Sequence, residues 1–217
     1  MTRKTPTRPY HHGDLKRALV EASLELIREE GVEALTVAEV GRRVGVSSAA
    51  PYKHFADRQA LLRAIAEEGN RRLGEALVVA TQGSTDPREA FRLSGVAYIR
   101  WAAEHPALYR IATDPAHIDY TSTSYEVDAP EALQGSMETF WPELGALVRS
   151  GAALPATHPL VQQLRGRALA QGMANLFVSG VFASLGITTA DAERMARAVT
   201  GEDVPATSRR STPSRSR

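Results

Sequence analysis

Apolar residues recur along most of the chain with the period of an α-helix, three or four positions apart. The first such segment begins at Asp14, a favourable N-cap residue, and closes at Gly31. Glutamates fill one side of this segment and apolar residues fill the other, so the pattern predicts an amphipathic helix. The residues of the apolar face are Leu15, Leu19, Ala22 and Leu26.

Similar patterns, bounded by capping residues, glycines or prolines, predict longer helices over residues 57–80, 86–103, 105–114, 128–147, 157–185 and 188–200. Pro142 interrupts one of them, so we expect a kink or a break near Trp141. Residues 115–129 show no period and are expected to form a long loop. Because no convincing strand pattern occurs, the chain is predicted to be all-α with about nine helices.

Residues 36–55 place two short helices and a glycine turn close together. Thr36 and Glu39 have capping-box spacing, in which the Thr hydroxyl accepts the N–H of Glu39 and the Glu carboxylate reaches back. Gly45 ends this helix, because glycine tolerates a left-handed turn. Ser47 or Ser48 then caps the second helix. Helix, glycine turn and helix are the layout of a helix-turn-helix DNA reader.

The same layout occurs in all-α proteins that never bind DNA, so the residue types in the second helix have to distinguish the two. Lys53 and His54 can donate hydrogen bonds to phosphates or base edges, and Tyr52 carries a hydroxyl within reach of phosphate. Ala49 and Ala50 are small enough for close approach to thymine methyl groups. Such residues are poor core material, and they favour a helix end that meets a groove.

Pro51 conflicts with a regular start to this second helix, because it has no backbone N–H. A helix capped at Ser47 loses the hydrogen bond from residue 51 back to residue 47. If Ser48 is the cap instead, Pro51 falls within the first turn, where no donor is missed. We therefore expect a helix that begins a residue late or has a tightened first turn.

Composition narrows the class of protein. The 217 residues, 43% of them hydrophobic, suffice for one substantial core or two small ones. A net charge of +1 means that nucleic-acid affinity must come from local charge. The absence of cysteine excludes disulfides and thiolate zinc sites and fits a reducing compartment. With neither a signal core nor an apolar run of about 18 to 20 residues, we expect a cytoplasmic protein without a membrane partner.

No residue pattern typical of catalysis or of cofactor binding stands out, so we expect neither an enzyme nor a bound cofactor. Ser-His-acid sets, glycine-rich phosphate loops and paired carboxylates in a suitable context are all missing. His117 lies between Asp114 and Asp119, but the spacing is irregular and argues against a metal site. His11 and His12 are assigned to a polar N-terminal arm.

Residues 14–72 resemble the N-terminal domain of the TetR family of transcriptional regulators. The resemblance combines the Thr-x-x-Glu start at residues 36–39, Gly45, the Tyr-x-x-Phe pair at residues 52–55 and the acid-capped helix beginning Ala-Asp-Arg-Gln-Ala-Leu-Leu at residues 56–62. Residues 10–14 and 49–52 look like one subgroup, whose C-terminal domain bears a Trp-x-x-x-His-Gly signature. Here Gly172 is kept, while Arg167 and Gln171 stand in place of the Trp and the His.

This resemblance implies a homodimeric repressor that binds a palindromic double-stranded DNA operator and releases it when a small-molecule effector binds. An effector-independent DNA-binding or architectural protein is the alternative. The basic arm with Arg3, Lys4 and Arg8 either follows the minor groove or is disordered. Phe55, Val40 and Val46 are expected to hold the domain together. The implied DNA contacts are Thr36, Ser47, Ser48, Ala49, Tyr52, Lys53 and His54.

The C-terminal half suits dimerisation and ligand binding. Residues 160–185 are apolar on several faces and rich in small residues, which suits an intersubunit four-helix bundle with the last helix, carrying Met195, Ala196 and Val199. The alternative is a core helix of a monomer. A ligand pocket needs apolar walls with a few polar groups. The candidates, each also a possible core residue, are Tyr98, Trp101, Tyr109, Met137, Phe140, Trp141, Gln171 and Asn175.

Gln171 and Asn175 lie one helical turn apart, so their amides can enter one cavity, bond to each other or face a partner subunit. Together these patterns predict four regions: a flexible basic arm at 1–13, a helix-turn-helix domain at 14–72, a helical ligand-binding and dimerisation domain at 73–200, and a disordered basic tail at 201–217.

Overall fold

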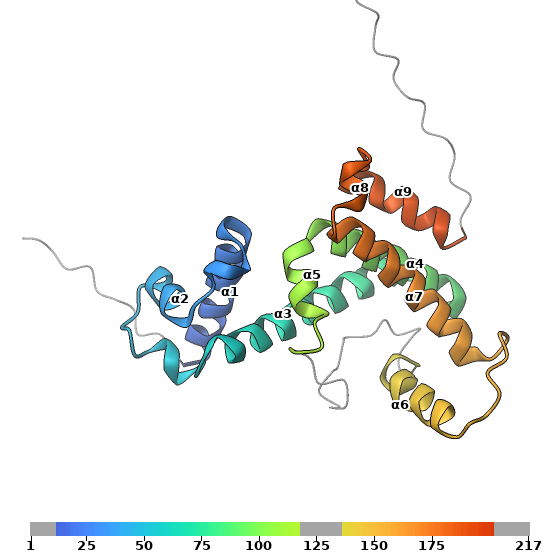
Figure 1. Ribbon diagram of the computed structural model, residues 1–217, viewed down its shortest axis with the longest axis horizontal. Helices are drawn as coiled ribbons and strands as arrows, with labels where there is room; N and C mark the ends of the chain where they lie inside the picture. The colour runs from blue at the N-terminus through green and yellow to red at the C-terminus, as the bar shows by residue number, and fades with distance from the viewer. Residues whose placement is uncertain (1–11, 118–135, 202–217) are drawn as a thin grey trace, which may run out of the picture.

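The computed structural model describes residues 12–117 and 136–201, and within these residues the chain forms nine α-helices, two short 3-10 helices and no strand (Figure 1). The all-α prediction is confirmed. The elements are α1 (His12–Glu30), η1 (Val32–Ala34), α2 (Val37–Val44), η2 (Pro51–Lys53), α3 (Arg58–Thr81), α4 (Pro87–Glu104), α5 (Pro106–Ala112), α6 (Ser136–Arg149), α7 (Pro159–Val178), α8 (Val181–Ser184) and α9 (Thr189–Val199).

Some sequence-based expectations fall outside the described residues. These are the basic arm up to His11, most of the loop after Pro115, the start of the helix expected from residue 128, and the tail from residue 202. Within the described residues, no helix is long and apolar enough to cross a membrane.

The N-terminal helices α1 and α2 and the first half of α3 surround one apolar core. Leu19, Leu26, Leu35, Leu61 and Ile65 are completely buried there. Burial of one such side chain stabilises the fold by roughly 1.5–3 kcal/mol. The core therefore fixes the angles between the short helices, which are too short to be stable alone.

Helix α4 is the centre of the C-terminal half and packs against α3, α7 and α9 (Figure 1). Ile99 and Ala102 of α4 are completely buried, and Ala174 of α7 and Ala196 of α9 pack into the same interior. Helix α3 continues from the N-terminal core into this half, so a single helix belongs to both.

Capping residues set the predicted helix starts. The Asp57 carboxylate accepts the N–H of Ala60 at 2.7 Å at the start of α3, and the Asp86 carboxylate accepts the N–H of Arg88 at 3.0 Å at the start of α4. Gly31 ends α1 with a φ of 86°, as predicted. Asp14 is not the N-cap of α1, however, because the helix already begins at His12.

Two predictions about the later helices are wrong. Pro142 lies inside a continuous α6 rather than at a break, and α7 does not run to residue 185. It ends at Val178, because Gly180 adopts the left-handed conformation with a φ of 83°. The chain then turns into α8, and the Phe182 ring packs edge-on against Phe177 with 4.7 Å between centroids.

Candidate nucleic-acid interface and ligand cavity

The start of α2 is capped as the sequence predicts, but only in part. The Thr36 hydroxyl accepts the N–H of Glu39 at 3.1 Å. The Glu39 carboxylate accepts hydrogen bonds from Arg42 at 2.6 and 2.8 Å and from Arg43 at 3.3 Å instead of reaching back to Thr36. The hydrogen bond from Arg42 is the main cause that lowers the pKa of Glu39 from 4.5 to about 2.

Arg43 ties α2 to the end of α1. Its guanidinium pairs with Glu29 at 2.6 Å and also with Glu30. Arg58 acts from the other side, donating to the carbonyl oxygens of Val32 at 2.9 Å and Leu35 at 3.1 Å. Both basic groups therefore position the turn that leads into α2.

The segment after Gly45 is tighter than the predicted helix. Residues 48–50 form turns, and only Pro51–Lys53 are helical, with 3-10 geometry. The predicted Ser47 or Ser48 cap is wrong, because Ala50 precedes this helix and no side chain caps it. The reason is the missing N–H of Pro51: the Ser47 carbonyl accepts from Ala50 at 3.0 Å instead. The tightening expected for the first turn thus extends over the whole segment.

Pro51 packs directly onto Gly41 of α2. Pro51 and Gly41 are both buried, and a Cβ atom added to Gly41 would overlap the Cγ of the proline ring, closer than the 3.0 Å that real Cβ atoms essentially never pass. Phe55, which is 3% exposed, fixes the other end of the segment in the N-terminal core. The segment is therefore held at both ends while its middle is at the surface.

The predicted DNA contacts lie together at this end of the molecule. Tyr52 is 51% exposed, although large aromatic residues are usually more buried. His54 is half-buried. The fully exposed members of the set are Thr36, Ser47, Ser48, Ala49, Tyr52 and Lys53. The arrangement offers small side chains, hydroxyls and one lysine to a partner, which suits the edge of a DNA groove.

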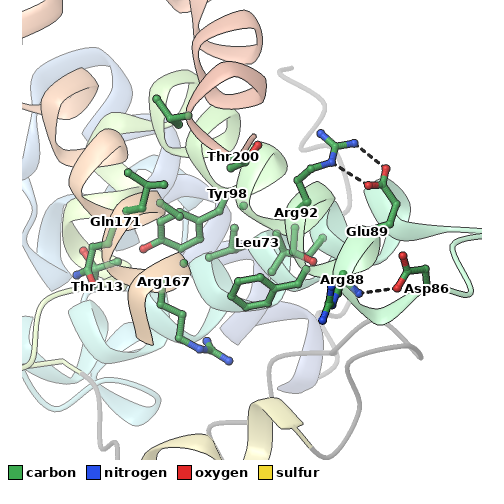
Figure 2. A pocket seen from close by; sticks show the side chains of 18 of the residues that line it. Leu73, Asp86, Arg88, Glu89, Arg92, Tyr98, Thr113, Arg167, Gln171 and Thr200 are labelled. Atoms are coloured by element: carbon green, nitrogen blue, oxygen red, sulfur yellow. Dashed lines mark hydrogen bonds and ion pairs between the residues drawn. The ribbon is translucent and has the colours of Figure 1, made fainter. Parts of the chain in front are cut away.

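A cavity of about 560 Å³ lies in the C-terminal half, within the size range of sites for small organic ligands (Figure 2). Its wall combines apolar side chains with a few charged and polar ones. Each of the helices α3, α4, α6, α7 and α9 contributes to it. The main contributors are Leu73, Leu77, Arg88, Phe91, Arg92, Tyr98, Trp141, Arg167, Gln171 and Val199.

Three of the predicted ligand-binding residues, Tyr98, Trp141 and Gln171, line this cavity. The structure places Trp101, Tyr109 and Phe140 in the interior instead, at 5%, 1% and 0% exposure.

Two further candidates, Asn175 and Met137, are also outside the cavity wall as described. The Asn175 side chain accepts a hydrogen bond from the Tyr109 hydroxyl at 3.3 Å, so it does not enter the cavity beside Gln171. Burial raises the pKa of Tyr109, which keeps its hydroxyl protonated as a donor. The side chain of Met137 lies outside the described residues.

Sequence reasoning missed the contribution of α4. Arg88, Phe91, Arg92, Gly95 and Tyr98 recur every three or four positions and line the cavity from one face of the helix. The Phe91 ring lies so close to Gly166 of α7 that a Cβ there would overlap it. This periodic stripe was visible in the sequence, but aromatic residues alone had been selected.

Helix α5 connects the cavity region with the N-terminal core. Its Ile111 belongs to that core, its Tyr109 packs in the interior of the C-terminal half, and Thr113 directly after it lines the cavity. Gly69 of α3 permits the close crossing of α3 and α5, since a Cβ there would come within 2.9 Å of Leu108.

The histidine considered as a metal ligand has no second carboxylate in view. His117 Nδ1 lies 3.8 Å from Asp114 Oδ2, and Asp119 falls outside the described residues. Within the described ranges, no three His, Asp or Glu side chains are grouped closely enough to hold a metal ion.

Two solved structures have the same fold. The chain is 30% identical to a protein of unknown function from Rhodococcus sp. RHA1, with a TM-score of 0.62 over 89% of this chain and 97% of that one. It is 15% identical to the fatty acid degradation regulator FadR from Bacillus halodurans, with a TM-score of 0.53 over 90% and 97%.

Curated relatives match over a shorter range. The chain is 30% identical over 112 residues to the HTH-type transcriptional regulator BetI of Rhizobium meliloti, covering 52% of this chain and 54% of the relative. A BetI of Escherichia coli is 30% identical over 115 residues, covering 44% and 59%. The chain therefore spans little more than half the length of these relatives.

Family models match both halves of the chain. Residues 19–65 match the bacterial regulatory proteins of the tetR family, and residues 91–201 match the tetracyclin repressor-like C-terminal domain. The first range contains the helix-turn-helix segment, and the second contains most of the cavity wall. The chain therefore belongs to the TetR family, whose members are DNA-binding transcriptional regulators and not enzymes.

Proposed function

We propose that this regulator is a repressor that binds a palindromic operator as a homodimer, in the cytoplasm, and releases it when a small molecule fills the cavity. The single observation that carries this proposal is the continuity of α3. The helix begins at Asp57, two residues after the exposed segment ends at Phe55, and its Leu73 and Leu77 line the cavity.

This continuity gives the effector a mechanical route to the DNA-binding end. A helix of 24 residues is about 36 Å long, so a small tilt at the cavity moves the far end by several ångströms. Helix α5 supplies a second connection, because Ile111 packs in the N-terminal core while Thr113 lines the cavity. A ligand shifts the equilibrium only as far as it binds one arrangement better than the other.

The exposed face of α7 and α8 supports the dimer. Leu176, Val181 and Leu185 are 37%, 46% and 69% exposed, and a Cβ at Gly172 would meet nothing within 4 Å. Contiguous apolar and small residues on a surface mark an interaction site. The partner helix differs from the expectation, because Ala196 and its neighbours on α9 pack against α4 of the same chain.

The assignment of individual roles rests on the same basis. The seven predicted DNA contacts, with the domain limits at residues 14–72 and 73–200, remain our proposal, supported by the exposure of that segment. The subgroup with the Trp-x-x-x-His-Gly signature stays a prediction carried by residues 10–14, 49–52 and Gly172. Arg167 and Gln171 depart from that signature and both line the cavity.

The alternative of an effector-independent DNA-binding protein requires a C-terminal half that is packed solid. The cavity of about 560 Å³ favours a sensor instead. The test begins with selection of duplexes from a random DNA pool by the full-length protein. We expect enrichment of an inverted repeat that a mixture of small organic compounds displaces in fluorescence anisotropy. Enrichment of a site that no compound displaces would favour the alternative, and no enrichment would contradict DNA reading itself.

A further inference from the structure

The cavity wall is charged at one end and apolar at the other. The start of α4 contributes Asp86, Arg88, Glu89 and Arg92, whereas Leu73 and Leu77 of α3, with Tyr98 later in α4, lie farther along the same wall. The α4 stripe thus runs from a cationic first turn to an aromatic third turn. A ligand that fills this space has to be polar at one end only.

The charges at the polar end do not cancel. Arg92 pairs with Glu89 at 2.6 and 2.8 Å, as Figure 2 shows, and the Asp86 carboxylate accepts the N–H of Arg88 as the N-cap of α4. The Arg88 guanidinium has no hydrogen bond or ion pair within the described part of the chain. It is therefore available to a ligand.

Two further features add positive potential at this end. Arg167 of α7 lines the cavity with its guanidinium carbon 4.4 Å from the centre of the Phe140 ring, an arrangement that fixes a cation without neutralising it. The N-terminus of α4 also points its free N–H groups toward this region, which favours an anion. Three arginines and two carboxylates line the cavity, so the wall carries a net positive charge.

We propose that the effector of this regulator is an amphipathic anion, an apolar molecule with one carboxylate, whose head binds Arg88 and whose body lies along Leu73, Leu77 and Tyr98. This inference rests on the proposed function, because it names the ligand of the same cavity. A cationic head would face the arginines, and a neutral head would leave Arg88 without a counter-ion. Arg88 presents a planar pair of donors that matches a carboxylate.

The test compares three probes with the same apolar chain and different heads: decanoate, decanol and decyltrimethylammonium, all below micelle-forming concentrations. Binding to the full-length protein is followed by tryptophan fluorescence, since Trp141 lines the cavity, and by calorimetry. Decanoate should bind about tenfold more tightly than decanol, the difference typical of one charge-assisted hydrogen bond, and the cation should bind weakest.

The matched variants are Arg88→Gln and Arg100→Gln, which remove one arginine each from the same helix. Arg100 does not line the cavity and pairs loosely with Glu104 at 3.9 Å and Glu193 at 3.7 Å. Arg88→Gln should abolish the preference for decanoate over decanol, while Arg100→Gln should keep it. Equal affinity of the three probes, or an unchanged preference in Arg88→Gln, would overturn the assignment of the anionic head.

DNA release is measured separately with the selected operator. Decanoate that binds in the cavity but leaves the operator complex intact would support the ligand class and contradict the proposed release mechanism. Release by decanol or by the cation, without release by decanoate, would support an effector-gated regulator and overturn the anionic ligand.

Discussion

Replacing Gly41 with alanine tests whether the contact with Pro51 holds the DNA-reading segment in place. Alanine in a helix interior is normally more stable than glycine by roughly 0.5–1 kcal/mol. Here the added Cβ would overlap Pro51 Cγ and lie 3.4 Å from Cδ, and neither a buried proline ring nor a helix backbone can move cheaply. Overpacking of this kind costs about 1–3 kcal/mol, so we expect a net loss of about 1–2 kcal/mol.

Thermal unfolding and operator binding together provide the assay. A loss of this size lowers the Tm of a chain this long by about 2–8 °C, and the displaced segment should bind the operator more weakly. Gly95→Ala is the control, because its Cβ would make an ordinary 3.5 Å contact with Thr200 and should raise the Tm. A Gly41→Ala protein as stable as Gly95→Ala would refute the reasoning.

A double variant separates the steric contact from a general effect on α2. In Gly41→Ala with Pro51→Ala the ring is gone, and residue 51 regains an N–H that can donate to the Ser47 carbonyl. The two changes should therefore be less damaging together than their sum, with a coupling of at least about 1 kcal/mol. Strict additivity would mean that Gly41 and Pro51 act independently.

Three further changes test other parts of the molecule. Lys53→Ala should weaken operator binding at an unchanged Tm and lower the slope of log affinity against log salt by about 0.9, the value for one phosphate contact; unchanged affinity would remove Lys53 from the contact set. Gly172→Leu should leave helix content unchanged, because the site is open within the chain, and yield monomers in sedimentation velocity; an intact dimer would exclude this face as the interface. Arg42 is the main group that holds the pKa of Glu39 at about 2 instead of 4.5, so its ion pairs stabilise the fold fully above 4.5 and are lost as the pH falls toward 2. The difference in Tm between the parent and Glu39→Gln should shrink over that range, and a constant difference would contradict the ion-pair assignment.

The two halves of the candidate site differ in how far the sequence predicts them. The DNA-reading segment is defined by local rules, because a cap, a glycine turn and small polar residues follow one another within a few positions. The cavity is a space left between helices that are distant in the chain. Trp101 and Phe140 have the same composition signature as the cavity residue Trp141, yet they are 5% and 0% exposed while Trp141 is 42% exposed. Only the packing of α4 against its neighbours distinguishes a wall from a core.

The end of α7 shows the same limit within a single helix. Gly172 and Gly180 both lie in one apolar stretch rich in small residues, so the sequence favours one continuous helix through both. Gly172 stays helical, whereas Gly180 takes a φ of 83°. Helix propensity disfavours both glycines equally, by about 1 kcal/mol relative to alanine, and therefore cannot choose between them. What differs is the residue that follows: after Gly180 the chain turns so that Phe182 is 9% exposed and packs against Phe177. Burial of one phenylalanine is worth roughly 1.5–3 kcal/mol, more than the helical hydrogen bonds lost at the turn, so a tertiary contact decides where the helix stops.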